Sequence, residues 1–218
     1  MHSFTEENYL KAIYHLSEGN SVAVSTNSIA EVTNTKAASV TDMLRKLADK
    51  KLINYVKYQG VTLTGIGIKA AVNIIRKHRL WEVFLVEKLG FKWDEVHDIA
   101  EELEHINSIS LIDRLDDFLG NPIADPHGDP IPDRTGNFKH KTLIKVSDMK
   151  QGQGGIISGV SEHSSIFLKH LEKLSLTLGT KIIITDVIEF DGSIILTVDE
   201  TKERTISREV AKNILVIL

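Results

Sequence analysis

The residues best suited to chemistry lie between positions 97 and 105, where the chain reads His-Asp-Ile-Ala-Glu-Glu-Leu-Glu-His. On a helix, this spacing would place on one side the side chains of His97, Glu101, Glu104 and His105. Two imidazoles and two carboxylates on one stripe are a typical ligand set for a divalent cation. His78 and Glu82, one helical turn apart, form a second candidate set. The alternative is an exposed acidic helix whose histidines bind nothing.

The composition is that of an ordinary globular chain, with 218 residues, 42% hydrophobic and 26% charged. This length permits one large domain or two to three small ones. No apolar run approaches the ~20 residues that a membrane span needs, and the N-terminal stretch has an amphipathic helix pattern instead of a signal-peptide pattern. The absence of cysteine excludes disulfides, thiolate catalysis and thiolate-rich zinc sites. We therefore expect a cytoplasmic protein without a membrane partner.

The net charge of −4 conceals an uneven distribution of charged residues. From Thr33 to Gly60 there are six basic residues and two acidic ones, whereas from Asp94 to Asp125 ten acidic residues accompany a single arginine. A basic part followed by an acidic part indicates a polyanion-binding module joined to a cation-binding module.

The first segment, residues 1–64, has the element order of a winged helix-turn-helix. Hydrophobic periodicity and turn residues predict four elements in order. They are a helix with apolar residues Phe4, Tyr9, Ile13 and Leu16 at helical spacing and Thr5 as its N-cap, a short helix opened by Ser25 or Thr26, a longer helix over 37–51, and a hairpin of strands 52–57 and 60–63. In that fold the second helix of the turn lies in the DNA major groove.

The longer helix has suitable chemistry for that groove. Lysines can neutralise phosphates, hydroxyls can contact phosphates or base edges, a methyl side chain can touch thymine, and a carboxylate can accept a hydrogen bond from cytosine. The predicted DNA-binding residues are Lys36, Ala38, Ser39, Thr41, Asp42 and Lys46. The alternative is a winged helix that binds protein and has a solvated basic face.

The second segment, residues 65–121, is predicted to be helical. Gly65-Ile66-Gly67 should break the hairpin, and a long helix should follow it. Asp94 should cap the helix that carries His97 to His105, and Ser108 or Ser110 should cap a third helix. Wide apolar stripes on these helices predict a dimerisation domain, which a two-fold DNA-binding protein requires. We therefore expect a homodimer.

A linker over residues 122–142 holds all four prolines of the chain. Within it Asp125, His127 and Asp129 could ligate a metal, but we favour a hydrogen-bonded turn. Residues 143–218 then predict a small SH3-like β-barrel, with a helix over 165–174 and strands around 156–157, at 181–184, 188–190, 193–198 and 214–218. The predicted fold class is mainly α with a β tail.

Several segments in this order resemble the diphtheria-toxin-repressor family of metal-dependent transcriptional regulators, in its manganese-responsive branch. The matching segments are TEENYLKAIYHL, AASVTDMLRKLADKKLI, YQGVTLTGIG, RKHRLWEVFL, VHDIAEELEH and DPHGDPIP. The resemblance covers essentially the whole chain, and the C-terminal part resembles the FeoA-type SH3-like domain of longer members.

The resemblance implies two metal sites. The primary site would consist of Asn8, Glu101, Glu104 and His105. The ancillary site would consist of His78, Glu82 and His97, with Glu162 and His163 as candidate ligands from the SH3-like domain. Glutamate at position 101, where iron-responsive members have cysteine, favours Mn²⁺ over Fe²⁺ and Zn²⁺.

Two positions depart from the family's pattern. Asn8 stands where the manganese branch has aspartate, and a neutral amide oxygen binds a cation more weakly. Lys11 stands where the short manganese regulators have a second carboxylate, which argues against their closely spaced pair of metals.

The resemblance further implies a repressor that binds a double-stranded DNA operator and controls metal-uptake genes, most simply manganese uptake, without enzymatic activity or a small organic substrate. Bound metal would join the first helix to the helix at 97–105 and so set the spacing of the two recognition helices. Without metal, the acidic residues would repel one another and a hinge near residues 64–67 would be loose. The alternatives are a metal-independent winged-helix regulator that senses another ligand and a divalent-metal hydrolase.

Overall fold

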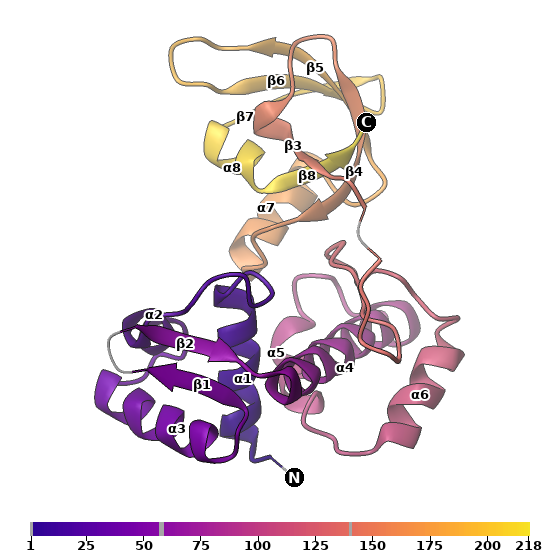
Figure 1. Ribbon diagram of the computed structural model, residues 1–218. Helices are drawn as coiled ribbons and strands as arrows, with labels where there is room; N and C mark the ends of the chain where they lie inside the picture. The colour runs from indigo at the N-terminus through magenta and orange to yellow at the C-terminus, as the bar shows by residue number, and fades with distance from the viewer. Residues whose placement is uncertain (1, 57–58, 140) are drawn as a thin grey trace. The chain divides into compact units, whose positions relative to one another are not determined.

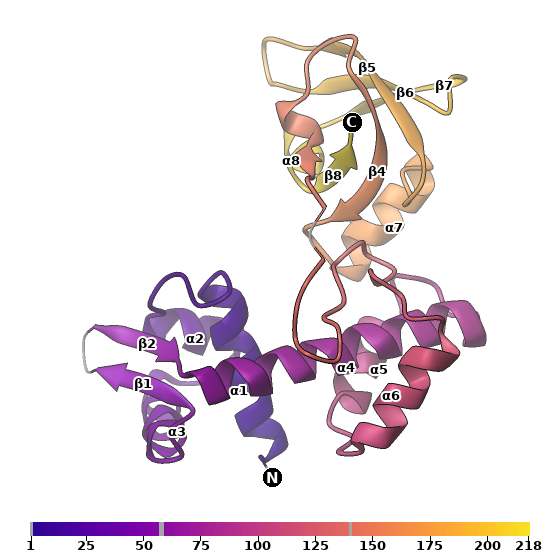
Figure 2. The same ribbon diagram turned by 45° about the vertical axis from the view of Figure 1, so that its right-hand side comes forward.

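The computed structural model describes residues 2–56, 59–139 and 141–218 (Figures 1 and 2). The chain divides into two compact units, one of Met1–His78, Glu101–Ile112 and Pro132–Asn137, the other of Arg79–Ala100, Asp113–Ile131 and Phe138–Leu218. Each unit has its own hydrophobic core. No helix in the described part of the chain combines the length and the apolar composition needed to cross a membrane.

The first unit begins with the predicted winged-helix order. Its elements are α1 (Phe4–Leu16), α2 (Thr26–Val32), α3 (Ala37–Asp49), β1 (Ile53–Val56) and β2 (Gly60–Leu63). The predicted cap at Thr5 was wrong, because Ser3 caps α1: its hydroxyl accepts from the Glu6 amide at 3.3 Å, and the Glu6 carboxylate accepts from the Ser3 amide at 3.0 Å. This reciprocal pair is a capping box. The Lys57 end of the predicted first strand and the turn residue Tyr58 lie outside the described residues.

The core of this unit explains which face of α3 is outward. The three buried residues of α3 are Val40, Leu44 and Leu47, at helical spacing. They pack with apolar residues of α1, α2 and the hairpin, and Val24 extends the hairpin by a bridge to Val61. The opposite face of α3 is therefore left to solvent.

Helix α4 (Gly65–Leu89) starts earlier than predicted. The hairpin ends before Gly65, as predicted, but Gly65 and Gly67 already belong to the helix because Thr64 caps it: its hydroxyl accepts from the Gly67 amide at 3.1 Å and donates to the Leu52 carbonyl at 3.0 Å. A Cβ at Gly67 would overlap that carbonyl oxygen. The segment 64–67, predicted as a hinge, is thus the capped start of α4, and α4 continues from the first unit into the second.

The acidic helix is shorter than its sequence pattern suggested. Helix α5 spans His97–Leu103, so Glu104 and His105 follow its end, and the next helix is α6 (Ile109–Phe118). Ser108 accepts from the Leu111 amide at 3.3 Å and caps α6, as one of the two predicted choices. Asp94, predicted to cap α5, instead accepts from the Ser165 hydroxyl and pairs with Lys169, each at 3.3 Å.

The second unit contains a six-stranded antiparallel sheet in the order β3-β8-β4-β5-β6-β7. In chain order its elements are β3 (Ile144–Lys145), the 3-10 helix η1 (Val146–Asp148), β4 (Gly154–Val160), α7 (Ser165–Leu174), β5 (Lys181–Val187), β6 (Ile194–Val198), β7 (Lys202–Ile206), α8 (Arg208–Lys212) and β8 (Ile214–Ile217). The sheet is curled (Figure 2), and α7 starts and ends as predicted. The predicted strand at 188–190 was wrong, because β5 ends at Val187 and the chain then turns. The Gly192 amide donates to the Ile188 carbonyl at 2.8 Å across this turn.

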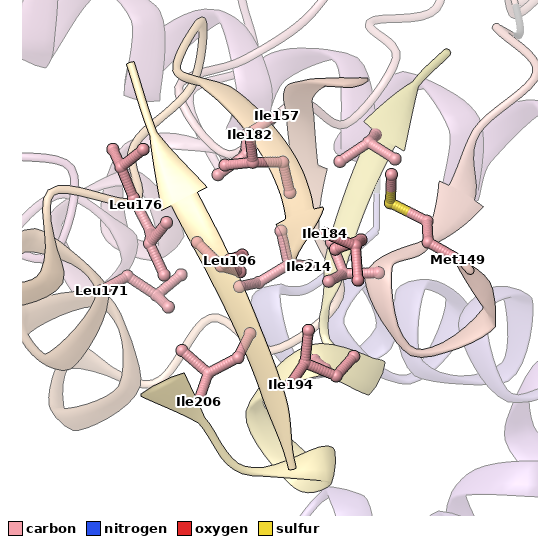
Figure 3. Close-up of a cluster of buried hydrophobic side chains, with 14 of the residues drawn as sticks. Met149, Ile157, Leu171, Leu176, Ile182, Ile184, Ile194, Leu196, Ile206 and Ile214 are labelled. Atoms are coloured by element: carbon pink, nitrogen blue, oxygen red, sulfur yellow. The ribbon is translucent and has the colours of Figure 1, made fainter. Parts of the chain in front are cut away.

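Alternating apolar residues build the interior of this sheet. In β6, Ile194, Leu196 and Val198 are buried and the intervening residues are only partly so. Figure 3 shows Leu196 and Ile194 among side chains from the neighbouring strands, with Leu171 of α7 beside them. The buried residues of this core and those of the first unit's core form two separate clusters.

Candidate metal centre

Glu104 is the centre of the first cluster of charged side chains. Its side chain is fully buried, and both of its oxygens lie near the Lys11 ammonium: Nζ is 2.7 Å from Oε1 and 2.8 Å from Oε2. His78 Nδ1 lies 2.7 Å from the same Oε2. Glu101 Oε1 lies 3.3 Å from Lys11 Nζ. Two of the predicted primary ligands therefore converge on one ammonium nitrogen, and His78 contacts this cluster as well.

The environment of Glu104 favours its ionised form. Burial raises the pKa of this carboxyl, but the hydrogen bond with His78 and the positive charge of Lys11 outweigh burial and lower the pKa. Oε1 has no hydrogen bond of good geometry, although Lys11 is close. A buried carboxylate with an underused oxygen is a suitable ligand for a divalent cation.

His105 is oriented by a residue that the sequence patterns did not single out. Its Nδ1 lies 2.6 Å from Glu7 Oε2, and both side chains are buried. Because a carboxylate accepts the hydrogen bond, Nδ1 carries a proton, and in the neutral imidazole the lone pair is then on Nε2. Nε2 is 4.0 Å from Glu104 Oε1. Histidine ligands of metals are commonly held by such a carboxylate on the other ring nitrogen.

The other predicted primary ligands are less enclosed. The Glu101 side chain is half exposed, and Asn8 is exposed on α1 next to Glu7. The structure thus brings Glu104 and His105 together, with Glu101 joined through Lys11. A sequence signal for Glu7 existed, since two glutamates precede Asn8 and the capping box explains only Glu6.

Of the predicted ancillary residues, two lie together in the second unit. His97 Nδ1 is 3.6 Å from Glu82 Oε1, and Glu82 is 2% exposed. His78 precedes Glu82 by one turn of α4 but belongs to the first unit, where it contacts Glu104. The predicted single stripe over residues 97–105 was nevertheless wrong, because His97 contacts Glu82 whereas Glu104 contacts Lys11 and His78.

The proline-rich linker places two further possible metal ligands beside Glu82. The Glu82, Asp125 and His127 side chains are all buried, their possible ligand atoms lie within 4.8 Å of one another, and His127 Nδ1 is 3.5 Å from Glu82 Oε2. Asp125 also forms the expected turn, since its Oδ1 accepts from the amides of His127 at 2.8 Å and Asp129 at 3.0 Å. The turn interpretation is confirmed, and the same turn presents a possible ligand set.

The buried carboxylates of this second cluster favour a positive charge beside them. Burial and the negative charges of Glu82 and Asp129 raise the pKa of Asp125 to about 7, although Arg79 opposes them. Burial lowers the pKa of His127, but its bond with Glu82 and the carboxylate charges raise it to about 9. Asp125 therefore keeps its proton to a higher pH than an ordinary carboxyl group, and His127 favours its protonated form beside Glu82. A divalent cation would replace those protons.

Of the two candidates from the β tail, one lies beside this cluster. The His163 ring stacks on His127 with centroids 4.9 Å apart, and its Nε2 is 3.9 Å from Asp129. Glu162 is exposed, and its Oε1 accepts from the Ser164 amide at 2.8 Å, which lowers the pKa of Glu162. Their roles as ligands stay predictions.

The outward face of α3 carries the predicted DNA-binding residues. Lys36, Ala38, Ser39 and Asp42 are exposed, and Asp42 pairs with Arg45 at 3.2 Å. The Thr41 hydroxyl donates to the Ala37 carbonyl at 2.9 Å, so it is used within the helix. Lys46 lies 3.1 Å from Glu6 of α1. The predicted face with Lys36 and Lys46 is therefore at the surface, and Lys46 also connects α3 to α1.

A winged helix with a solvated basic face, combined with buried carboxylate–imidazole clusters, defines a class of metal-responsive DNA-binding regulators. Family models match in the same order: the N-terminal DNA-binding domain of iron-dependent repressors over residues 1–61, their metal-binding and dimerisation domain over 64–133, and the FeoA domain over 144–218. The chain belongs to the iron-dependent repressor family.

Relatives support this assignment. The chain is 37% identical over 113 residues to an uncharacterised helix-turn-helix regulator from Methanocaldococcus jannaschii, covering 52% of this chain and 90% of that one. It is 35% identical over 128 residues to the iron-dependent repressor IdeR from Mycobacterium bovis, covering 59% of this chain but only 55% of IdeR. A manganese-dependent transcriptional repressor solved with manganese superimposes with a TM-score of 0.87 and 34% identity, over 97% of this chain and 99% of that one.

The comparisons confirm the predicted fold class and function class. The chain is a metal-dependent, DNA-binding transcriptional repressor, mainly α with a β tail of the FeoA type. The family consists of transcriptional repressors, so the expectation of a regulator instead of a hydrolase is also confirmed.

Proposed function

We propose that this repressor responds to Mn²⁺ and represses genes for metal uptake, with Fe²⁺ and Zn²⁺ as the alternative metals. The observation that carries the proposal is the donor set: buried carboxylates and imidazoles, with no thiol anywhere in the chain. Hard oxygen ligands favour Mn²⁺ over softer metals. The solved manganese-bound repressor gives independent support.

Two groups of residues would hold the cations. The first would contain Glu104 and His105 with Glu101, Asn8 and His78; the second would contain Glu82, Asp125 and His127 with His97, and His163 or Glu162 as further candidates. A divalent ion supplies the positive charge that these buried carboxylates otherwise take from lysine and histidine. Glu7 keeps His105 Nε2 available as a ligand. The first group would thereby connect α1 of the winged-helix domain to residues 101–105.

The repressor would bind its operator as a homodimer. The region that matches the family's dimerisation domain exposes large apolar side chains, which water-facing surfaces usually avoid in such numbers. They are Leu89, Ile109, Leu111 and Phe118. Two copies of α3 would then contact successive major grooves, with Lys36, Ser39 and Lys46 on phosphates and Ala38, Thr41 or Asp42 near base edges.

The domain boundaries that we propose are 1–64 for the winged helix, 65–121 for dimerisation and metal binding, 122–142 for the linker and 143–218 for the SH3-like domain. They agree closely with the matched ranges except in the linker, where the metal-binding match extends to residue 133. That extension includes Asp125 and His127, which supports their assignment to the metal centre.

A mobility-shift assay tests the proposed function. The probe is a duplex selected from a random library by the protein in Mn²⁺. The parent chain should bind this duplex at least about 100-fold more tightly in Mn²⁺ than in EDTA, a typical size for coupling between two sites. Glu104→Ala should lose that dependence, because it removes the only fully buried carboxylate of the first group.

Glu102→Ala is the matched control, since Glu102 is an exposed neighbour in α5. It should keep the parent's metal response. If Glu104→Ala responds to Mn²⁺ as the parent does, the first group is not the regulatory site. Repeating the titration with Zn²⁺ and with anaerobic Fe²⁺ ranks the metals, and a stronger response to either would overturn the choice of Mn²⁺.

A further inference from the structure

Lys11 occupies the position that a cation in the first group would need. Its ammonium contacts both oxygens of Glu104, at 2.7 and 2.8 Å, and Glu101 Oε1 at 3.3 Å. These are oxygens of two carboxylates assigned to the metal. Lys11 follows Glu7 by one turn of α1, so the same helix face carries the orienting carboxylate and the competing ammonium.

An ammonium ion and a divalent cation use the same carboxylate lone pairs, so both cannot hold Glu104 fully at one time. We propose that Lys11 is an internal competitor of the metal: its ammonium neutralises Glu101 and Glu104 until a divalent cation displaces it. This inference rests on the proposed function of the same cluster. It also replaces the expectation that the acidic residues repel one another when no metal is bound.

The surroundings of Lys11 permit such an exchange. Its side chain is 14% exposed and ends next to Glu101, which is half exposed, so the ammonium can move into water. The other lysine near Glu104 is Lys77 of α4, which is 3% exposed and has a pKa lowered by burial, although Glu7 and Glu104 oppose that change. Lys77 can compensate for part of the charge, but Lys11 is the one that contacts the carboxylate oxygens and borders solvent.

The consequence is a raised metal threshold. When a binding-competent form is populated only in part, the apparent affinity falls by that fraction. If Lys11 holds the carboxylates about 90–99% of the time, the apparent Mn²⁺ affinity is about 10- to 100-fold weaker than that of the unobstructed site. The repressor would then respond only after the free metal has risen above that level.

The test compares Lys11→Met with the parent and with Lys212→Met, whose lysine pairs with Glu209 at 3.0 Å on the exposed helix α8. Mn²⁺ binding is followed by the electron paramagnetic resonance of the free ion, and thermal unfolding is recorded in EDTA. We expect Lys11→Met to bind Mn²⁺ at least about tenfold more tightly and to melt several degrees lower in EDTA, because Glu104 loses its counter-ion. Lys212→Met should match the parent in both measurements.

A second measurement needs no variant and covers the case in which Lys11→Met does not fold in EDTA. The acetylation rates of individual lysines of the parent are measured by mass spectrometry with and without Mn²⁺. Lys11 should react faster once Mn²⁺ has displaced it, whereas Lys212 should not change. Unchanged or slower acetylation of Lys11, or unchanged or weaker Mn²⁺ binding by Lys11→Met, would overturn the proposal. If Glu104→Ala leaves Mn²⁺ binding intact, the metal site itself is misplaced, which is a different failure.

Discussion

Glu7 is the residue on which the geometry of the first metal group depends most. It is buried, and its Oε2 accepts a hydrogen bond from His105 Nδ1 at 2.6 Å. Without that bond the imidazole could place its proton on either nitrogen, and the ring could rotate away from Glu104. A residue that never touches the metal would therefore control whether one ligand is presented correctly.

Glu7→Gln tests this role with little change in shape. An amide accepts the Nδ1 hydrogen bond less strongly, so Mn²⁺ affinity should fall about 10- to 100-fold, the usual effect of losing a ligand's supporting partner. Isothermal titration calorimetry with Mn²⁺ provides the measurement, and Glu18→Gln, an exposed position past the end of α1, provides the control. Equal affinities for Glu7→Gln and the parent would show that His105 needs no such support.

At this scale the sequence pointed to candidate ligands but not to the side chains that contact them. Spacing alone pointed to Glu104, His105 and Glu82, because paired imidazoles and carboxylates are unusual on one segment. It did not place Asp125 with Glu82, since that contact joins a linker to a helix far away in the chain. Nor did it show what Lys11 contacts, because a lysine on α1 has many possible acidic partners.

Helix α1 is the element that joins the proposed first metal group to α3, the predicted recognition helix. Two consecutive residues contact different partners: Glu7 binds His105, whereas Glu6 binds Lys46 of α3 at 3.1 Å and Lys50, the C-cap residue of α3, at 2.7 Å. Burial raises the pKa of Glu6, but hydrogen bonds from Lys50, the Ser3 backbone and Lys46 outweigh it and lower the pKa from 4.5 to about 2. A movement of α1 would therefore be transmitted to α3 through Glu6.

This pKa predicts a dependence of stability on acidity. A carboxyl with a depressed pKa in the folded state stabilises the fold above its unfolded pKa, and that stabilisation is lost as the pH falls from about 4.5 to 2. Because both lysines are partly exposed, we expect about 1–2 kcal/mol at neutral pH, less than the full shift implies. Glu6→Gln should cost about this much at pH 7 and almost nothing near pH 2.

Urea unfolding in EDTA between pH 7 and pH 2 measures the difference between the two proteins. Glu31→Gln, which changes an exposed glutamate of α2, serves as the control and should follow the parent at every pH. A constant difference between Glu6→Gln and the parent over the whole range would contradict the assigned ion pairs.

Element boundaries show where local sequence signals fail. The pattern over 97–105 favoured one continuous helix, yet α5 ends at Leu103, and this end frees Glu104 and His105 to contact residues of α1 and α4. The strand β7 was missed because Lys202–Ile206 is largely polar, as suits a strand at the edge of a sheet. Thr64 and Gly67 were misjudged because the packing of α4 on Leu52 is a tertiary contact.

For the whole molecule, the sequence was sufficient to predict the order of domains and the class of protein. Each of the two cores is built from regular apolar periodicity, which is a local signal. The metal groups are different, because they depend on residues from α1, α4, α5 and the linker meeting at two points. The family resemblance predicted most of the residues in these two groups. The contacts of Glu7, Asp125 and His127 with them were found only in the structure.

The central claim is that cation binding and DNA binding are coupled in one protein. Thermodynamic reciprocity provides the most direct test, because the factor by which Mn²⁺ tightens DNA binding must equal the factor by which DNA tightens Mn²⁺ binding. The measurement is Mn²⁺ affinity of the parent chain with and without the selected duplex at constant salt. We predict an increase of about 100-fold on the duplex, matching the loss of DNA affinity in EDTA. Equal Mn²⁺ affinity on and off DNA would contradict the account.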